Sequence, residues 1–239
     1  GSDGAPRIMG GMREDHPAET ARPRRNRVDP EGRIVAIAAR GAWTGNRGIL
    51  HRGTEIVRPW AGIAWIICAL EFRGRRIPQW APGHYTPLFF TDEAVALAAG
   101  HRPCALCRRP AFRAFVEAVD PPGALRAPNL DRLLHAQRRV PADDPQRSAR
   151  AWPELPDGTF VRWPDRPAVL VGDALVEWAG GTYRRAVRRP HTGRAAVLTP
   201  PATVTALAAG YPVQIDDAAL VLAGRVPSAR ARPPARPGD

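Results

Sequence analysis

The stretch Leu88–Arg109, with the sequence LFFTDEAVALAAGHRPCALCRR, decides the fold of this chain. Its apolar start predicts a short strand, Leu88–Phe90, and the alanine-rich run behind it predicts a helix. Thr91 suits the N-cap of that helix, because a side-chain oxygen there accepts a hydrogen bond from a free backbone N–H. Asp92 adds a negative charge that the helix dipole favours. Gly100 provides the left-handed stop typical of a helix C-terminus.

The same stretch ends in a Cys-x-x-Cys turn, formed by Cys104 and Cys107, which are two of only three cysteines. Two thiolates at this spacing hold one soft metal ion, and zinc is the usual occupant. Structural zinc takes four ligands, so two more are expected. Cys68 is the third candidate, since its predicted strand adjoins the strand–helix–turn unit. The fourth ligand stays open among three histidines, which we rank in the order His51, His84 and His101.

Two alternatives to this metal site remain at the level of sequence. Cys68 is also compatible with a buried apolar side chain, because free cysteine is among the most buried residue types. Cys104 and Cys107 are also compatible with a metal-free redox dithiol. Such pairs usually lie in a βαβ context of the thioredoxin type, which this sequence does not predict.

The pattern F-x-x-x-A-x-A-x-A-A-G-H-R-P-C-x-x-C-R begins at Phe90 and resembles part of a known domain. It is similar to the second half of the N-terminal zinc domain of Ada-type DNA repair proteins, over about residues 88–109. The resemblance implies a zinc fold and contact with DNA. It also implies transfer of a methyl group from a backbone phosphotriester onto a zinc-bound thiolate, a role for which Cys68 is the candidate acceptor.

The chain departs from that family pattern upstream of the turn. The family carries two further cysteines four residues apart, whereas here Cys68 has Ala64 and Phe72 at those distances. A site of three thiolates and one neutral histidine carries one negative charge fewer than a site of four thiolates. Its thiolates are therefore weaker nucleophiles. The resemblance thus favours a zinc fold and DNA contact over methyl transfer.

The order of predicted elements indicates an α+β protein with two modules. Residues 1–31 and 224–239 are rich in arginine and proline without periodicity, which predicts disordered tails. Residues 32–140 predict a small zinc-stabilised module of strands and helices. A polar linker over 141–152 follows, and the short, regularly spaced strands of 153–223 predict a small antiparallel β-rich region.

Charge and composition bound the function of the chain. It has 239 residues and a net charge of +12, and all of its basic residues are arginines. This balance favours a polyanionic partner, nucleic acid and DNA in particular. The arginine, alanine and proline content is typical of a GC-rich bacterial genome. With no apolar run of about 20 residues, no secretory pattern and few cysteines, we expect a cytoplasmic protein that does not span a membrane.

Three groups of polar side chains are candidates for nucleic-acid contacts. Asparagine and arginine pair with two hydrogen bonds to adenine and guanine edges, and a guanidinium fork also suits phosphate. One group lies in a glycine-flanked turn, one in a tight turn between strands, and one where the helix after the cysteine turn begins. These candidates are Asn46 and Arg47, then Arg73, Arg75 and Arg76, and finally Arg108 and Arg109.

The leading hypothesis is a zinc-binding, nucleic-acid-binding protein of DNA repair or processing, in which zinc is mainly structural. An alternative is an enzyme acting on DNA or RNA. Asp131 and His135 lie four residues apart on a predicted helix and share a face, as an acid–base pair of a phosphoester hydrolase would. A further alternative is a structural or protein-interaction module without a basic surface on one side.

Overall fold

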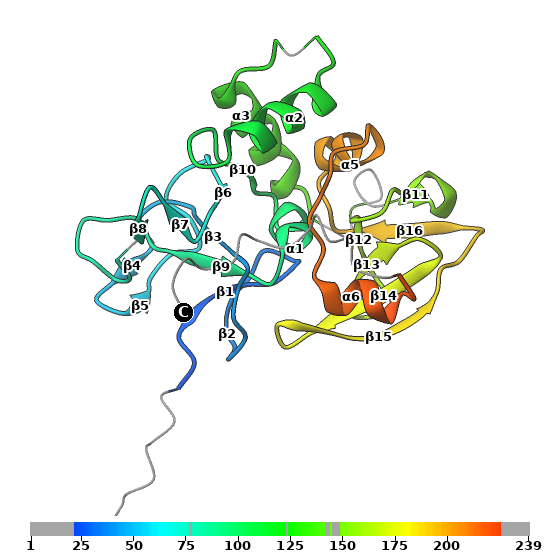
Figure 1. The fold of residues 1–239 in the computed structure, drawn as a ribbon, viewed down its shortest axis with the longest axis horizontal. Helices are drawn as coiled ribbons and strands as arrows, with labels where there is room; N and C mark the ends of the chain where they lie inside the picture. Colours follow the sequence, from blue (N-terminus) through cyan, green and yellow to red (C-terminus); the bar gives the residue numbers. More distant parts are fainter. Residues whose placement is uncertain (1–21, 77, 123, 142–143, 145–148, 226–239) are drawn as a thin grey trace, which may run out of the picture.

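The fold consists of two six-stranded sheets with the short helix α1 (Glu93–Ala98) between them (Figure 1). The computed structural model describes residues 22–76, 78–122, 124–141, 144 and 149–225. Helices and sheets are mixed, as the predicted α+β class requires. Within the described residues, no helix is both long and apolar enough to cross a lipid bilayer.

The first sheet is mixed and carries the cysteine turn at one edge. Its edge strand β10 runs parallel to β6, and β9 runs parallel to β1, whereas the other neighbours are antiparallel. Two small hairpins, β4–β5 and β7–β8, accompany it. In sheet order the strands are β10 (Arg102–Pro103), β6 (Ile66–Cys68), β3 (Trp43–Asn46), β9 (Leu88–Phe90), β1 (Arg25–Val28) and β2 (Ile34–Ala36). The hairpin strands are β4 (His51–Arg52), β5 (Glu55–Ile56), β7 (Glu71–Phe72) and β8 (Arg75–Arg76).

Strand β1 corrects the predicted N-terminal tail. Arg25–Val28 pairs with both β2 and β9, and Asn26 and Val28 are buried. The prediction of disorder over 1–31 is therefore wrong for the residues from 25 onward, while 1–21 lie outside the described residues. The sequence RNRV has no apolar run, so its strand conformation depends on two neighbouring strands that only the fold provides.

The second sheet is antiparallel throughout. Within the region 153–223, the sequence predicts strands at 159–163, 168–171, 174–178 and 183–187, and four strands of this sheet end within about a residue of these bounds. The strands are β11 (Ala149–Ala151), β16 (Arg194–Val197), β12 (Phe160–Arg162), β13 (Pro167–Val171), β14 (Ala174–Ala179) and β15 (Thr182–Arg188), in sheet order. Strand β11 and the 3-10 turn Trp152–Glu154 occupy part of the predicted linker 141–152. Residues 142–143 and 145–148 lie outside the described part.

In the part of the chain that the structure describes, four further helices lie around the sheets (Figure 1). Helix α5 packs against α2, where the Phe115 and Tyr211 rings meet with their centroids 5.3 Å apart. Helix α6 packs on β15. The helices are α2 (Arg109–Val119), α3 (Ala127–Arg139), α5 (Pro201–Ala208) and α6 (Asp217–Leu222).

Helix α1 joins the two sheets into one packed unit. All six of its residues are buried. Opposite faces of the α1 segment belong to different apolar clusters, one on each sheet. Ala94, Val95 and Ala98 lie in the cluster of the second sheet, and Ala96, Leu97 and Ala99 in that of the first. Because α5 also packs into the first cluster, hydrophobic packing crosses the boundary expected near residues 141–152.

Side chains at the start of α1 fix it to the C-terminal part of the chain. The N-cap is Asp92, not Thr91: Asp92 Oδ1 accepts from the Val95 N–H at 2.8 Å. Its other oxygen accepts from the Tyr183 hydroxyl at 2.7 Å. Thr91 instead donates to the carbonyl of Gly181. The carboxylate of Asp92 therefore caps the helix in place of the Thr91 hydroxyl. The same carboxylate accepts a hydrogen bond from Tyr183, which belongs to the second sheet.

Candidate metal centre

The parallel pairing of β10 with β6 places two cysteines side by side. Cys68 ends β6, and Cys104 directly follows β10. The register pairs Pro103 with Ile67, and the Cys104 N–H donates to the Ile67 carbonyl at 2.9 Å. The backbone ladder thus brings Cys104 beside Cys68, and the turn that precedes α2 then returns Cys107 to the same point.

The three sulfur atoms of Cys68, Cys104 and Cys107 form a cluster that can hold a metal ion. All three lie within 4.8 Å of one another. Cys68 is buried, whereas Cys104 and Cys107 are partly exposed, and none of the three forms a disulfide. With zinc–sulfur bonds of about 2.3 Å, sulfur atoms at this spacing fit around a single ion. The predicted association of Cys68 with the Cys-x-x-Cys turn is therefore present.

Backbone amides around the sulfur atoms stabilise thiolates. The Leu106 N–H donates to Cys104 Sγ at 3.4 Å. Hydrogen bonds from the thiols of Cys107 and Cys68 lower the pKa of Cys104 to about 2, and the same bonds raise the pKa of both donors. Three sulfur atoms this close share protons in the absence of a cation. A divalent ion between them would favour the thiolate form of all three.

None of the three ranked histidines joins the cysteine cluster, which corrects the predicted fourth ligand. His51 Nδ1 lies 2.6 Å from Thr86 Oγ1, and His84 is exposed. His101 is fully buried and accepts a hydrogen bond from Arg47 Nε at 3.2 Å. Among the described residues, no histidine, cysteine or carboxylate extends the cluster to four ligands. The β4–β5 hairpin and the end of α1 direct these histidines to other partners.

Tyr85 is a polar neighbour of the cluster that the sequence did not indicate, because only cysteines and histidines were considered as zinc ligands. Burial raises the pKa of Tyr85 to about 12, and the negative charges of the three cysteines add to that effect. The residue belongs to the loop before β9 and is partly buried. A phenol beside three thiolates can donate a hydrogen bond to them or to whatever completes the metal site.

Arg108 is not positioned for the predicted phosphate contact. Its guanidinium pairs with Glu93 at 2.8 Å and lies 3.9 Å from the centroid of the Trp43 ring. Its side chain is only 9% exposed. The next residue, Arg109, is exposed at the start of α2 and stays a candidate. Of these two consecutive arginines, the first is buried and ties α1 to the cysteine turn, and the second faces solvent.

The Asn46–Arg47 turn is also structural. Arg47 is 1% exposed, and its Nη1 donates to the Gly32 carbonyl at 2.9 Å. Its guanidinium lies 3.7 Å from the centroid of the Trp65 ring. Asn46 Oδ1 accepts from the Gly48 N–H at 3.2 Å within its own turn. Burial of Arg47 behind β3 therefore overturns the prediction that it reads base edges.

The third predicted group lies on the β7–β8 hairpin. Arg73 occupies the turn with a φ of +54° and is exposed, and its guanidinium lies 5.1 Å from the centroid of the Phe72 ring. Arg75 and Arg76 form β8, but their side chains lie outside the described part. A nucleic-acid contact by these three arginines stays a prediction.

Asp131 and His135 do not form an acid–base pair. Both carboxylate oxygens of Asp131 accept from the Arg102 guanidinium at 2.8 Å, and both side chains are buried. His135 instead lies 3.1 Å from Arg138 and packs its ring edge-on against Trp60. Because the carboxylate is occupied by a buried ion pair, it orients α3 against β10. This geometry contradicts the predicted hydrolase centre.

A scan against protein-family models and searches of curated proteins and of solved structures found no match for this chain. The similarity of residues 88–109 to the Ada zinc domain therefore stays a prediction from sequence.

Proposed function

We propose that this protein binds zinc through Cys68, Cys104 and Cys107 and binds nucleic acid, DNA first, through exposed arginines. The observation that carries the proposal is the cluster of three sulfur atoms, assembled from two separate segments at the edge of the first sheet. The partial resemblance to the Ada zinc domain supports DNA repair or processing as the setting.

Zinc in this site would be mainly structural. Cys68 ends β6, and the other two ligands form the turn that leads into α2. An ion would therefore connect the edge of the first sheet to a helix across a long stretch of chain. An ion that binds only the folded state stabilises it by about 3 kcal/mol at a hundredfold excess over its dissociation constant.

Nucleic-acid binding is supported by the charge of the chain and by the exposure of many arginines. The net charge is +12. Four buried or partly buried arginines are engaged in ion pairs, ring contacts or hydrogen bonds to carbonyls, but others on both sheets and on helices α2 and α3 are exposed. An interaction with phosphates weakens with salt in proportion to the number of phosphates that are contacted.

The experiment measures metal content and DNA affinity on the full chain. We expect about one zinc per chain by elemental analysis, lost in Cys104→Ser and in Cys107→Ser. We also expect that labelled DNA binds with an affinity that falls steeply between 50 and 200 mM salt, as about six or more phosphate contacts imply. Purified protein without metal would remove the first half of the proposal, and salt-independent or undetectable DNA binding would remove the second.

The number of protein ligands favours a second candidate, a zinc site with one exchangeable position. Three protein ligands are typical of catalytic zinc, whereas structural zinc usually has four. Cys68 is 7% exposed, so a group-transfer reaction would use Cys104 or Cys107 rather than the predicted acceptor. Replacing zinc with cobalt, whose visible spectrum reports on its ligands, distinguishes a site with an exchangeable position from a closed one. A visible spectrum that changes with added cyanide indicates an exchangeable position, and an unchanged spectrum a closed structural site.

A further inference from the structure

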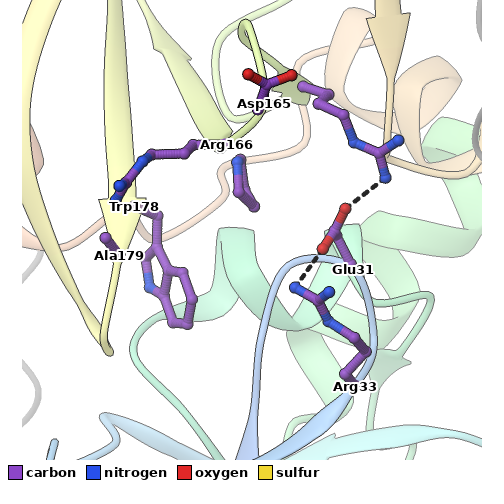
Figure 2. A pocket seen from close by; sticks show the side chains of 8 residues that line it. Glu31, Arg33, Asp165, Arg166, Trp178 and Ala179 are labelled. Carbon is purple, nitrogen blue, oxygen red and sulfur yellow. Dashed lines mark hydrogen bonds and ion pairs between the residues drawn. The ribbon is translucent and has the colours of Figure 1, made fainter.

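Two adjoining cavities lie where the β1–β2 hairpin meets the second sheet. Their volumes are about 530 Å³ and 350 Å³. Both are lined by Glu31, Arg33 and Arg162, so they adjoin at these residues, and together they are here termed the arginine groove. Figure 2 shows the larger cavity, with Glu31 and Arg33 on one side and Trp178 and Arg166 across the opening. Its volume suits a small ligand or part of a chain.

The groove is lined by positive charge in excess. Glu31 lies between two guanidinium groups and pairs with both Arg33 and Arg162 (Figure 2). A carboxylate held in this way shows that the two arginines converge on a position for an anion. Arg33 keeps 67% and Arg162 keeps 38% of its side-chain exposure. The charged residues of the lining are Arg33, Arg138, Arg139, Arg162 and Arg166 against Glu31 and Asp165.

Unpaired hydrogen-bond donors stand at the smaller cavity. Arg138 lines it, and within the described residues its buried Nε has no partner. Arg47 lies behind Gly32, another lining residue, and a Cβ at Gly32 would come within 3.9 Å of Arg47 Nη2. That Nη2 is also buried and without a partner in the described part. A buried donor without an acceptor is costly, so an acceptor bound at this wall would be favourable.

Arg47 and Arg138 also have no carboxylate in contact with their guanidinium groups among the described residues. Their guanidinium groups lie 3.7 and 4.0 Å from the centroid of the Trp65 ring. Burial lowers the pKa of Arg47 to about 9 and that of Arg138 to about 10. An anion in the smaller cavity would stabilise both charges, because opposite charges in a poorly solvated site attract strongly.

We propose that the arginine groove binds a phosphate group, held at the smaller cavity by Arg139, Arg138 and Arg162. A phosphate offers acceptors that match the planar guanidinium fork with two parallel hydrogen bonds. The phosphate belongs either to a nucleic-acid strand lying along the groove or to a free nucleotide. A nucleic-acid strand as the source rests on the proposed function, because the groove would then be the face with which the protein binds nucleic acid. A free nucleotide as the source does not rest on it.

The test compares two probes on the full chain and on four variants. The probes are a labelled single-stranded oligonucleotide, followed by fluorescence anisotropy, and inorganic pyrophosphate, followed by calorimetry. Arg139→Gln and Arg162→Gln each remove one charge from the groove, and Arg162→Lys keeps the charge without the fork. Arg52→Gln is the matched control, since Arg52 is exposed on β4 and does not line the groove.

For a probe that binds, we expect each glutamine variant to weaken the affinity about tenfold or more, as the loss of a charge-assisted hydrogen bond implies. The affinity of Arg162→Lys should lie between those of Arg162→Gln and the unchanged protein. Arg52→Gln should bind the probe like the unchanged protein. Thermal melting checks that Arg162→Gln keeps its fold, and Arg139 has an exposed side chain.

The outcomes separate the groove from the proposed function. Weakened binding of the oligonucleotide supports both. Weakened binding of pyrophosphate, with no oligonucleotide affinity at all, supports the groove as a site for a free nucleotide and overturns nucleic-acid binding. Glutamine variants that bind the oligonucleotide like Arg52→Gln leave nucleic-acid binding in place and overturn the groove. If neither probe binds, both the phosphate site in the groove and the proposed nucleic-acid binding are overturned.

Discussion

The region around the cysteine turn and the arginine groove use the same side chain in opposite ways. Beside the turn, Arg102 and Arg108 are buried, and each forms an ion pair with a buried carboxylate and lies against an aromatic ring. In the groove, Arg139 and Arg166 are exposed, whereas Arg33 pairs with Asp29 and Glu31, and Arg162 pairs with Glu31.

This difference shows that clusters of arginine in a sequence do not identify a nucleic-acid surface. A guanidinium is planar and weakly hydrated, so it packs on aromatic rings and enters the interior when a carboxylate or carbonyl accepts from it. What distinguishes a binding arginine is its exposure together with an excess of donors over acceptors nearby. The interior group should affect stability, and the groove should affect binding.

The largest effect is expected at the buried pair Arg102–Asp131. Asp131→Ala leaves a buried guanidinium without its carboxylate, so the free energy of unfolding should fall by about 3–5 kcal/mol. Chemical denaturation measures the change. The double variant Arg102→Met with Asp131→Leu should recover most of the loss, because it removes both charges together. A loss below about 1 kcal/mol for the single variant would show that Arg102 is hydrated in solution.

The neighbours Arg108 and Arg109 give the sharpest matched pair. Arg108→Ala leaves Glu93 buried with only its contacts to Tyr211 and Gln214, and should lower stability by about 3 kcal/mol. Arg109→Ala should change stability by less than about 0.5 kcal/mol, since the side chain is exposed. Denaturation of both variants under one set of conditions decides between them. Equal effects would contradict the assignment of Arg108 to the interior.

Asp92 should give stability a dependence on pH. Burial raises its pKa to about 6, although hydrogen bonds from Val95, Tyr183 and Asp216 oppose the shift. The folded state therefore favours the protonated acid. The contribution of Asp92 is fully present below its ordinary pKa near 3.8 and is lost as the pH rises through about 6. The shift of about two units corresponds to up to about 3 kcal/mol.

The measurement for Asp92 is denaturation between about pH 3.5 and 7.5. Asp92→Asn keeps an oxygen for the helix cap and should flatten the dependence by the stated amount relative to the unchanged protein. Carboxyl NMR shifts provide an independent titration of the same group. A slope that is identical in both proteins would place the pKa of Asp92 near its ordinary value.

The smallest effect on stability is expected in the groove. Arg139→Gln should change the free energy of unfolding by less than about 0.5 kcal/mol, because an exposed side chain without a buried partner contributes little. The same variant should lose phosphate affinity. A marked loss of stability without any change in binding would place Arg139 with the interior arginines and remove the contrast between the two regions.

The local elements could be predicted well because they depend on neighbours in sequence. The strand Leu88–Phe90, the stop at Gly100 with its φ of +83°, and the proline-started helix α2 are present as expected. The approach of Cys68 to the cysteine turn was also expected. Cys-x-x-Cys spacing is a short-range signal, whereas the position of Cys68 depends on the pairing of β6 with β10. The fourth ligand was not predictable in this way, since the directions of the histidine side chains depend on distant partners.

The sequence by itself determined the α1 segment, the cysteine turn, four strands of the second sheet and the excess of positive charge. Only the tertiary structure decided which arginines are buried, that β1 joins the first sheet, and that Glu31, Arg33 and Arg162 meet in a groove. The physical reason is the range of the interactions. Capping, periodicity and turn spacing act over a few residues, whereas burial of a charge depends on what the rest of the chain packs against it.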